Sequence, residues 1–170
     1  MAGEVLVRRV REDDWPLLRA VRLEMLADTP TAYLETLESA SARDQSEWRF
    51  RARRGSEGAE NLALAAVDPA TPQRWVGYLA CFVDTPGLAH LVSVYVAPAW
   101  RGTGLAERMV GEVRRWASES AGVGRLHLFV HEDNDRARAF YRRLGFSETG
   151  ATMPYELDPS RREIEMALLL

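Results

Sequence analysis

VYVAPAWRGTGLA, residues 94–106, is the stretch from which the fold of this chain can be worked out. It begins with three β-forming residues, and Pro98, which has no backbone N–H to donate, ends that strand. Gly102 and Gly104 then form a turn, and an amphipathic helical pattern starts at Leu105. A helix that follows such a turn presents free N–H groups and the positive end of its dipole, and glycine lets an anion approach them closely. The stretch therefore predicts a phosphate or pyrophosphate site.

The composition is that of a single globular protein domain. The chain has 170 residues, 46% of them hydrophobic and 28% charged, and we predict one domain over residues 1–170. The net charge of −3 argues against nucleic acid as a partner. The sequence has no apolar leader and no segment long enough to cross a membrane, so a cytoplasmic protein without membrane contact is expected.

The absence of lysine and the presence of a single cysteine exclude further chemistries. All 22 basic residues are arginine. A Walker phosphate loop and a Schiff-base enzyme both need a lysine, so neither is expected. The single cysteine, Cys81, lies in an apolar run and is predicted to be a buried thiol, not a nucleophile.

The rest of the chain reads as alternating groups of helices and strands. Strands are predicted over residues 5–10, 61–67, 74–83, 89–97, 125–131 and 164–169, with an irregular strand from Phe146. Helices are predicted from Asp13 or Asp14 to about Ala27, from Asp44 or Ser46 to Arg54, over residues 103–119, and from Asn134 to a C-terminal cap at Gly145. Residues 28–42 are expected to be loop with a short helical piece. This order predicts one α/β sheet of mixed strand direction.

Three kinds of phosphate site compete for the opening stretch. A dinucleotide fold needs G-x-G-x-x-G or A, but Glu107 occupies the third glycine's place. A Walker loop fails for want of lysine. The third kind combines Arg101-x-x-Gly104-x-Ala106 with a second element, N-x-x-A-x-x-x-Y-x-x-x-G-F over residues 134–146.

Together these two elements resemble the GCN5-related N-acetyltransferase (GNAT) superfamily. RGTGLA resembles its acetyl-CoA pyrophosphate motif R/Q-x-x-G-x-G/A, the preceding LVSVYVAP resembles its fourth strand, and NDRARAFYRRLGF resembles its later motif almost position for position. The resemblance extends over most of the chain and is weakest over residues 28–58, where these proteins build their acceptor sites. It implies an α/β fold of the α+β type: a mixed, mostly antiparallel sheet of six to seven strands, flanked by about four helices and splayed between the fourth and fifth strands.

The resemblance also implies acetyl-CoA as co-substrate, without a metal ion. Backbone groups of Val94 and Val96 would pair with the pantetheine amides, as a sheet edge pairs with a peptide. An N–H group of Val94 or Tyr95 would polarise the thioester carbonyl, and N–H groups of residues 101–106 would hold the pyrophosphate. The expected cofactor-binding residues are Val94, Tyr95, Val96, Arg101, Gly102, Thr103, Gly104, Leu105, Ala106, Asn134, Ala137 and Tyr141.

The implied reaction is direct transfer of an acetyl group to a primary amine. Tyr141 would protonate the leaving thiolate, although an aromatic residue at this spacing is also compatible with plain core packing. Some relatives use a glutamate as the base where this chain has Phe129. His90 is the nearest titratable group on the acceptor strand and is taken as the candidate base, with ordinary packing as its alternative. Glu35, Ser93 and Glu132 are weaker candidates.

The acceptor is expected to be a small-molecule or peptide amine. It would contact residues 33–35, the region of Trp48 and a loop over residues 150–159, where acidic side chains would suit a cationic amine. His127 and His131 lie about 13 Å apart on one strand, too far for one metal ion. The resemblance is also compatible with a homodimer formed through the C-terminal strands.

Two other functions stay open from the sequence. The first is a non-catalytic acyl-CoA-binding or regulatory module on the same fold, which the loss of the glutamate at Phe129 would suit. The second, an NAD(P)-binding oxidoreductase, is disfavoured by Glu107.

Overall fold

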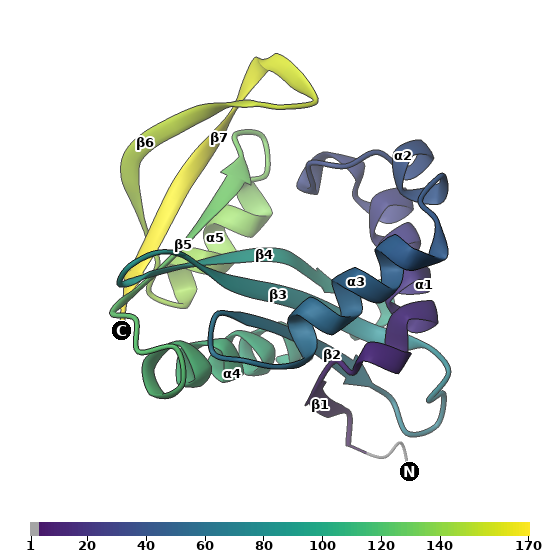
Figure 1. Cartoon of the computed structure of the whole chain (residues 1–170). Coiled ribbons are helices and arrows are strands. Elements are labelled where there is room, and N and C mark those ends of the chain that lie inside the picture. Colours follow the sequence, from purple (N-terminus) through teal and green to yellow (C-terminus); the bar gives the residue numbers. More distant parts are fainter. Residues whose placement is uncertain (1–3) are drawn as a thin grey trace.

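The computed structural model describes residues 4–170 and shows one seven-stranded sheet with helices on both faces (Figure 1). The strands are β1 (Leu6–Arg9), β2 (Asn61–Val67), β3 (Trp75–Thr85), β4 (Leu88–Val96), β5 (Arg125–His131), β6 (Ser147–Tyr155) and β7 (Asp158–Leu169). The α-helices are α1 (Trp15–Asp28), α2 (Leu37–Ser41), α3 (Gln45–Ser56), α4 (Leu105–Glu119) and α5 (Asp135–Arg143), with short 3₁₀ turns η1 (Glu12–Asp14), η2 (Pro30–Ala32) and η3 (Pro98–Trp100). The strand order is β1-β2-β3-β4-β5-β7-β6, which confirms the predicted sheet of mixed direction.

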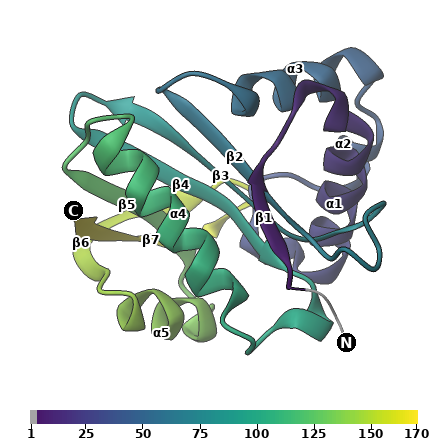
Figure 2. The ribbon, with the colours of Figure 1, turned by 90° about the horizontal axis from the view of Figure 1, so that it is seen from below.

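The helices divide the hydrophobic core into two layers. On one face α4 packs Met109 and Val113 against the strands, and α5 adds Tyr141 to the same cluster (Figure 2). On the other face α1 and α3 pack around Met25 and Trp48, both almost fully buried. The strongly one-sided apolar pattern of α4 explains why this helix lies flat against the sheet.

The centre of the sheet is split where β4 meets β5, its single parallel pair. Only three residue pairs join these strands, from Leu88 opposite Arg125 to His90 opposite His127. Beyond His90, β4 continues to Val96 without a partner on that side, while β5 bends away with β7 and β6 (Figure 1). The predicted splay between the fourth and fifth strands is confirmed, and it leaves backbone groups of β4 free along one edge.

A β-bulge that the sequence does not predict lies in β4 opposite β3. Tyr78 pairs with Tyr95 and Ala80 pairs with Val92, so three steps on β4 match two on β3. The extra residue falls at Ser93, whose φ of 58° lies in the left-handed region that a side chain seldom adopts. The bulge turns the chain beside the open edge of β4.

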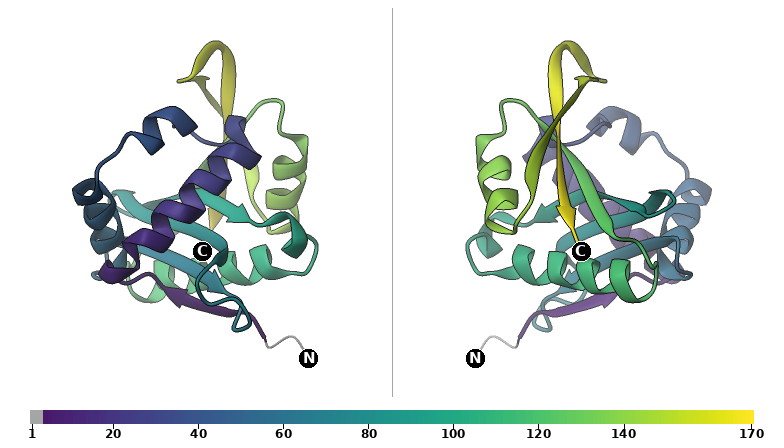
Figure 3. Two further views of the ribbon diagram at one scale, coloured as in Figure 1. Left: turned by 90° about the vertical axis from the view of Figure 1, so that its right-hand side faces the viewer. Right: turned by 90° about the vertical axis from the view of Figure 1, so that its left-hand side faces the viewer.

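The C-terminal region differs from the prediction of a loop over residues 150–159. Instead, β6 and β7 form a long hairpin with a tight turn around Glu156 and Leu157, and its tip projects beyond the other elements in both views of Figure 3. All residues of β6 except Tyr155 are exposed, so its sequence lacks the apolar alternation by which a strand is recognised.

Cys81 is buried, as predicted. Burial raises its pKa to about 12, so it stays a thiol at neutral pH. Among the helices of residues 4–170, none is long and apolar enough to cross a membrane.

Candidate active site

The turn before α4 has the features of an anion site. Gly102 and Gly104 have φ angles of 76° and 84°, which only glycine adopts without strain. Within the described residues, the backbone N–H groups of residues 102–107 make no hydrogen bond, whereas that of Arg101 already donates to the Pro98 carbonyl. Of the predicted donors at residues 101–106, those of residues 102–106 are thus free within the protein.

A cavity of about 440 Å³, here called the glycine-turn cavity, opens over these N–H groups. It is lined by Gly102, Gly104, Ala106 and Glu107 on one side and by Ala137, Phe140 and Tyr141 of α5 on the other. Two arginines of α5, Arg136 and Arg143, also line it and were not predicted. They lie seven residues apart and thus on one face of the helix, a signal that the sequence carried.

Arg101, predicted as a cofactor ligand, uses its side chain within the protein. Its Nε donates to the Val96 carbonyl at 3.0 Å, and its guanidinium forms an ion pair with Asp28. These contacts tie the end of β4 to the end of α1. Arg101 therefore fixes the position of the turn, and the turn's backbone groups face the cavity.

A second cavity, of about 480 Å³, fills the split between β4 and β5 and is here called the splay cavity. Its walls include Arg22, Asp84, His90, Val92, Ser93, His127, Phe129, His131, Met153 and Glu163. It shares six lining residues with the glycine-turn cavity: Ala32, Tyr33, Val94, Asn134, Ala137 and Tyr141. The two cavities thus meet beside the open edge of β4.

Tyr141 stands at this junction. Its side chain is 8% exposed and its ring packs edge-on against Phe140 and Phe146. Burial raises its pKa above the ordinary value, so the hydroxyl is protonated at neutral pH. Asn134 caps α5 by accepting from the Ala137 N–H at 3.1 Å, which leaves its amide nitrogen free to donate.

The carbonyl groups on β4 already have partners in the protein. The Tyr33 hydroxyl donates to the Val94 carbonyl at 3.1 Å, and the Tyr155 hydroxyl donates to the Tyr33 carbonyl at 3.0 Å. Burial raises the pKa of Tyr33 to about 12, so it acts as a donor here. Since a carbonyl oxygen has two lone pairs, Val94 and Val96 can each accept a second hydrogen bond.

The candidate base His90 belongs to a group that the sequence did not reveal. Its ring lies 4.6 Å from that of His127, and His127 Nε2 lies 3.1 Å from a carboxylate oxygen of Asp84. Burial, and then the charge of His127, lower the pKa of His90 to about 4. The metal-ligating atoms of the three residues all lie within 4.8 Å of one another.

The weaker candidates for the base are engaged elsewhere. Glu132 accepts from the backbone and guanidinium of Arg162, and Ser93 Oγ contacts Arg22 at 3.1 Å. Glu163 is 7% exposed and lines the splay cavity, and burial raises its pKa. The sequence does not predict this position, because the predicted last strand begins at Ile164, one residue after Glu163, whereas β7 begins at Asp158.

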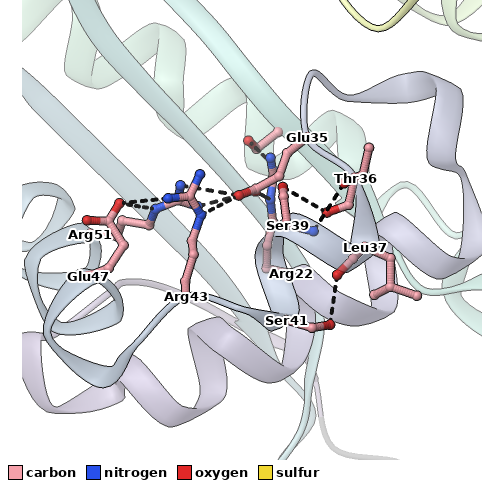
Figure 4. A network of polar contacts seen from close by, with 10 residues as sticks. Arg22, Glu35, Thr36, Leu37, Ser39, Ser41, Arg43, Glu47 and Arg51 are labelled. Carbon is pink, nitrogen blue, oxygen red and sulfur yellow. Dashed lines mark hydrogen bonds and ion pairs between the residues drawn. The ribbon is translucent and has the colours of Figure 1, made fainter.

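Glu35 is the centre of an arginine network (Figure 4). Its carboxylate accepts from Arg22 at 2.9 Å, Arg43 at 2.5 Å and Arg51 at 3.3 Å, and Glu47 pairs with the last two. Burial by itself would raise the pKa of Glu35. The three guanidinium groups outweigh this effect and lower the pKa of Glu35 to about 2. Three cations thus already neutralise Glu35, so it is not a free anion that could attract a cationic amine.

A sheet split at a parallel pair, with a phosphate-type turn at one end of the split, is the arrangement expected of an acetyltransferase. A family model described as "Acetyltransferase (GNAT) family" matches residues 21–146, so the chain belongs to the GNAT family of acetyltransferases.

Individual relatives agree with this assignment. The chain is 31% identical over 154 residues to a mycothiol acetyltransferase of Salinispora tropica. This alignment covers 86% of this chain and 44% of that protein. It thus spans less than half the length of this relative. A GNAT acetyltransferase from Streptococcus pneumoniae superposes with a TM-score of 0.82 at 18% identity, covering 98% of this chain and 99% of that one. The putative acetyltransferase yncA from Salmonella typhimurium, solved with acetyl-CoA, has a TM-score of 0.75 at 18% identity, covering 99% and 95%.

Proposed function

We propose that this chain transfers the acetyl group of acetyl-CoA to a primary amine. The observation that carries the proposal is the meeting of two cavities at Tyr141, one with free backbone donors for phosphates and one with titratable groups for an acceptor. The Salmonella relative of the same fold was solved with acetyl-CoA, which supports the same co-substrate here.

The residues around the glycine-turn cavity fit the charge of coenzyme A. The free N–H groups of residues 102–107 and the N-terminus of α4 would hold the pyrophosphate, because both favour an anion. Arg136 and Arg143 would add positive charge from the opposite wall. The pantetheine would then follow β4 past Val96 and Val94, and the thioester would reach Tyr141.

In the reaction, the lone pair of the amine attacks the thioester carbonyl, a C–N bond forms and the C–S bond breaks. Tyr141 donates its hydroxyl proton to the departing thiolate, and the second proton that the nitrogen loses as the amide forms restores Tyr141. The proton that the ammonium group loses goes to a base in the splay cavity. We assign this task to His90 together with His127 and Asp84, because a pKa near 4 makes His90 a weak base by itself.

Two measurements test the proposal. Calorimetry with acetyl-CoA, CoA and NAD should show binding of the first two alone. A thiol-release assay over a panel of amines should then show turnover, and acetylated product can be confirmed by mass. Because these 170 residues contain no lysine, no ε-amine of the chain itself contributes background. Binding without turnover of any amine would favour the non-catalytic module.

Replacing Gly104 with alanine should weaken acetyl-CoA binding. Its φ of 84° costs a residue with a Cβ about 1–2 kcal/mol, and relief of that strain would turn the N–H groups away from the phosphates. We expect Kd to rise about tenfold. Gly111→Ala is the matched control, since Gly111 lies inside α4 with open space around it. Equal Kd values for the two variants would contradict the assigned phosphate site.

A further inference from the structure

A third cavity lies on the α3 side of the sheet and is lined by arginine. It has a volume of about 290 Å³ and is here called the arginine recess. Its charged lining residues are Arg22, Arg51, Arg54 and Glu47, so arginine outnumbers glutamate three to one. The floor is formed by strand residues that include Tyr78, Val92 and Ser93.

The positive charge of the recess exceeds what the protein itself neutralises. The network of Figure 4, extended by Arg54, holds four arginines against two glutamates, Glu35 and Glu47. Arg54 forms no ion pair within residues 4–170, and its guanidinium lies 5.9 Å from the centre of the exposed Phe50 ring.

Tyr78 shows that the three guanidinium charges converge on one place. Burial raises the pKa of this tyrosine, and the charges of Arg22, Arg51 and Arg54 all oppose that rise. Its side chain is 8% exposed and lines the recess, and its hydroxyl makes no hydrogen bond within residues 4–170. An unpartnered donor beside three cations is suited to an anionic oxygen.

The arginine recess adjoins the splay cavity. Both are lined by Arg22, Val92 and Ser93, so the two cavities meet at the bulge of β4. A molecule whose amine approaches Tyr141 through the splay cavity can therefore extend over Ser93 toward Arg54.

We propose that the acceptor carries an anionic group, a carboxylate or a phosphate, in addition to its amine, and that Arg54 and Arg51 bind that group in the arginine recess beside Tyr78. Guanidinium matches both anions through paired hydrogen bonds. This inference rests on the proposed acetyltransferase function and adds the class of acceptor to it. It replaces the expectation of a cationic amine near Glu35, because that carboxylate is held by arginines.

The test compares acceptors that differ only in the anionic group. The thiol-release assay is run with ω-amino acids of increasing length against their amides, and with phosphoethanolamine against ethanolamine. We expect kcat/KM to be at least about tenfold higher for the anionic member of one pair. Preference within the first pair identifies a carboxylate and preference within the second identifies a phosphate. Equal rates for charged and uncharged members would overturn the inference while leaving the acetyltransferase function intact.

Two neighbouring arginines of α3 give a matched pair of variants. Arg53 and Arg54 are both exposed and without ion pairs within the described chain, but only Arg54 lines the recess. Arg54→Gln should raise KM for the anionic acceptor about tenfold, without changing KM for acetyl-CoA or for the uncharged amide. Arg53→Gln should leave all three unchanged. The same effect from both variants would overturn the inference, whereas failure of the wild-type protein to acetylate any amine would count against the function itself.

Discussion

Tyr141→Phe is expected to lower kcat by about 10²-fold or more, because it removes the proton that the leaving thiolate would receive. The ring and its contacts with Phe140 and Phe146 stay in place. The lost hydroxyl has no hydrogen-bond partner within the described residues, so the free energy of unfolding should hardly change. Steady-state kinetics should therefore show a lower kcat with an unchanged KM for acetyl-CoA, and thermal unfolding should match the wild type.

A change of acyl donor separates proton donation from a structural role of Tyr141. An acetyl thioester with a more acidic leaving thiol needs less help from a proton donor. The difference between Tyr141→Phe and the wild type should shrink with such a donor if the hydroxyl is the acid. A phenylalanine variant with wild-type kcat would rule out this role for Tyr141.

Glu35→Gln is expected to lower the free energy of unfolding by about 2–3 kcal/mol at pH 7 and Tm by about 5–10 °C. The substitution leaves the guanidinium groups of Arg22, Arg43 and Arg51 without their shared anion. Denaturant unfolding followed by tryptophan fluorescence is a direct measurement, since Trp48 is buried beside Arg51. Glu38→Gln is the matched control, because Glu38 is exposed and outside the network.

The effect of Glu35 should depend on pH in a defined direction. The pKa of Glu35 falls from an ordinary 4.5 to about 2 in the folded protein. A lowered carboxylate pKa stabilises the folded state above the unfolded pKa, and this stabilisation is lost as pH falls through the folded value. The difference in free energy of unfolding between wild type and Glu35→Gln should thus be largest above about pH 5 and should vanish toward about pH 2. A gap that stays constant from pH 7 to pH 3 would contradict the assigned ion pairs.

Local sequence signals predicted the parts of this site that depend on local geometry. Gly102 and Gly104 are needed wherever the backbone takes positive φ angles, and Asn134 caps a helix through its own neighbours. These features depend on a few consecutive residues, so the sequence displays them directly. The splay was inferred from the resemblance to a family and not from any such local signal.

The groups that the sequence did not predict are those brought together by long-range pairing. His90 meets His127 because β4 and β5 pair in one particular register, which neither strand specifies alone. Glu35 meets Arg22 and Arg51 because α1, α3 and the segment before α2 pack together. The bulge at Ser93 likewise depends on how β3 and β4 align, since serine has no intrinsic preference for a positive φ.

The three residue pairs that join β4 to β5 have a further consequence for how the protein opens and closes. Because so few pairs join them, strands β1–β4 and strands β5–β7 can move relative to each other as two halves after only a few hydrogen bonds break. Amide hydrogens along the free edge of β4 should exchange with solvent faster than those between β2 and β3, where pairing runs the full length. A pantetheine arm bound in the split would act as an extra strand between β4 and β5. Occupancy of the site would therefore convert two loosely joined halves into one cooperative unit.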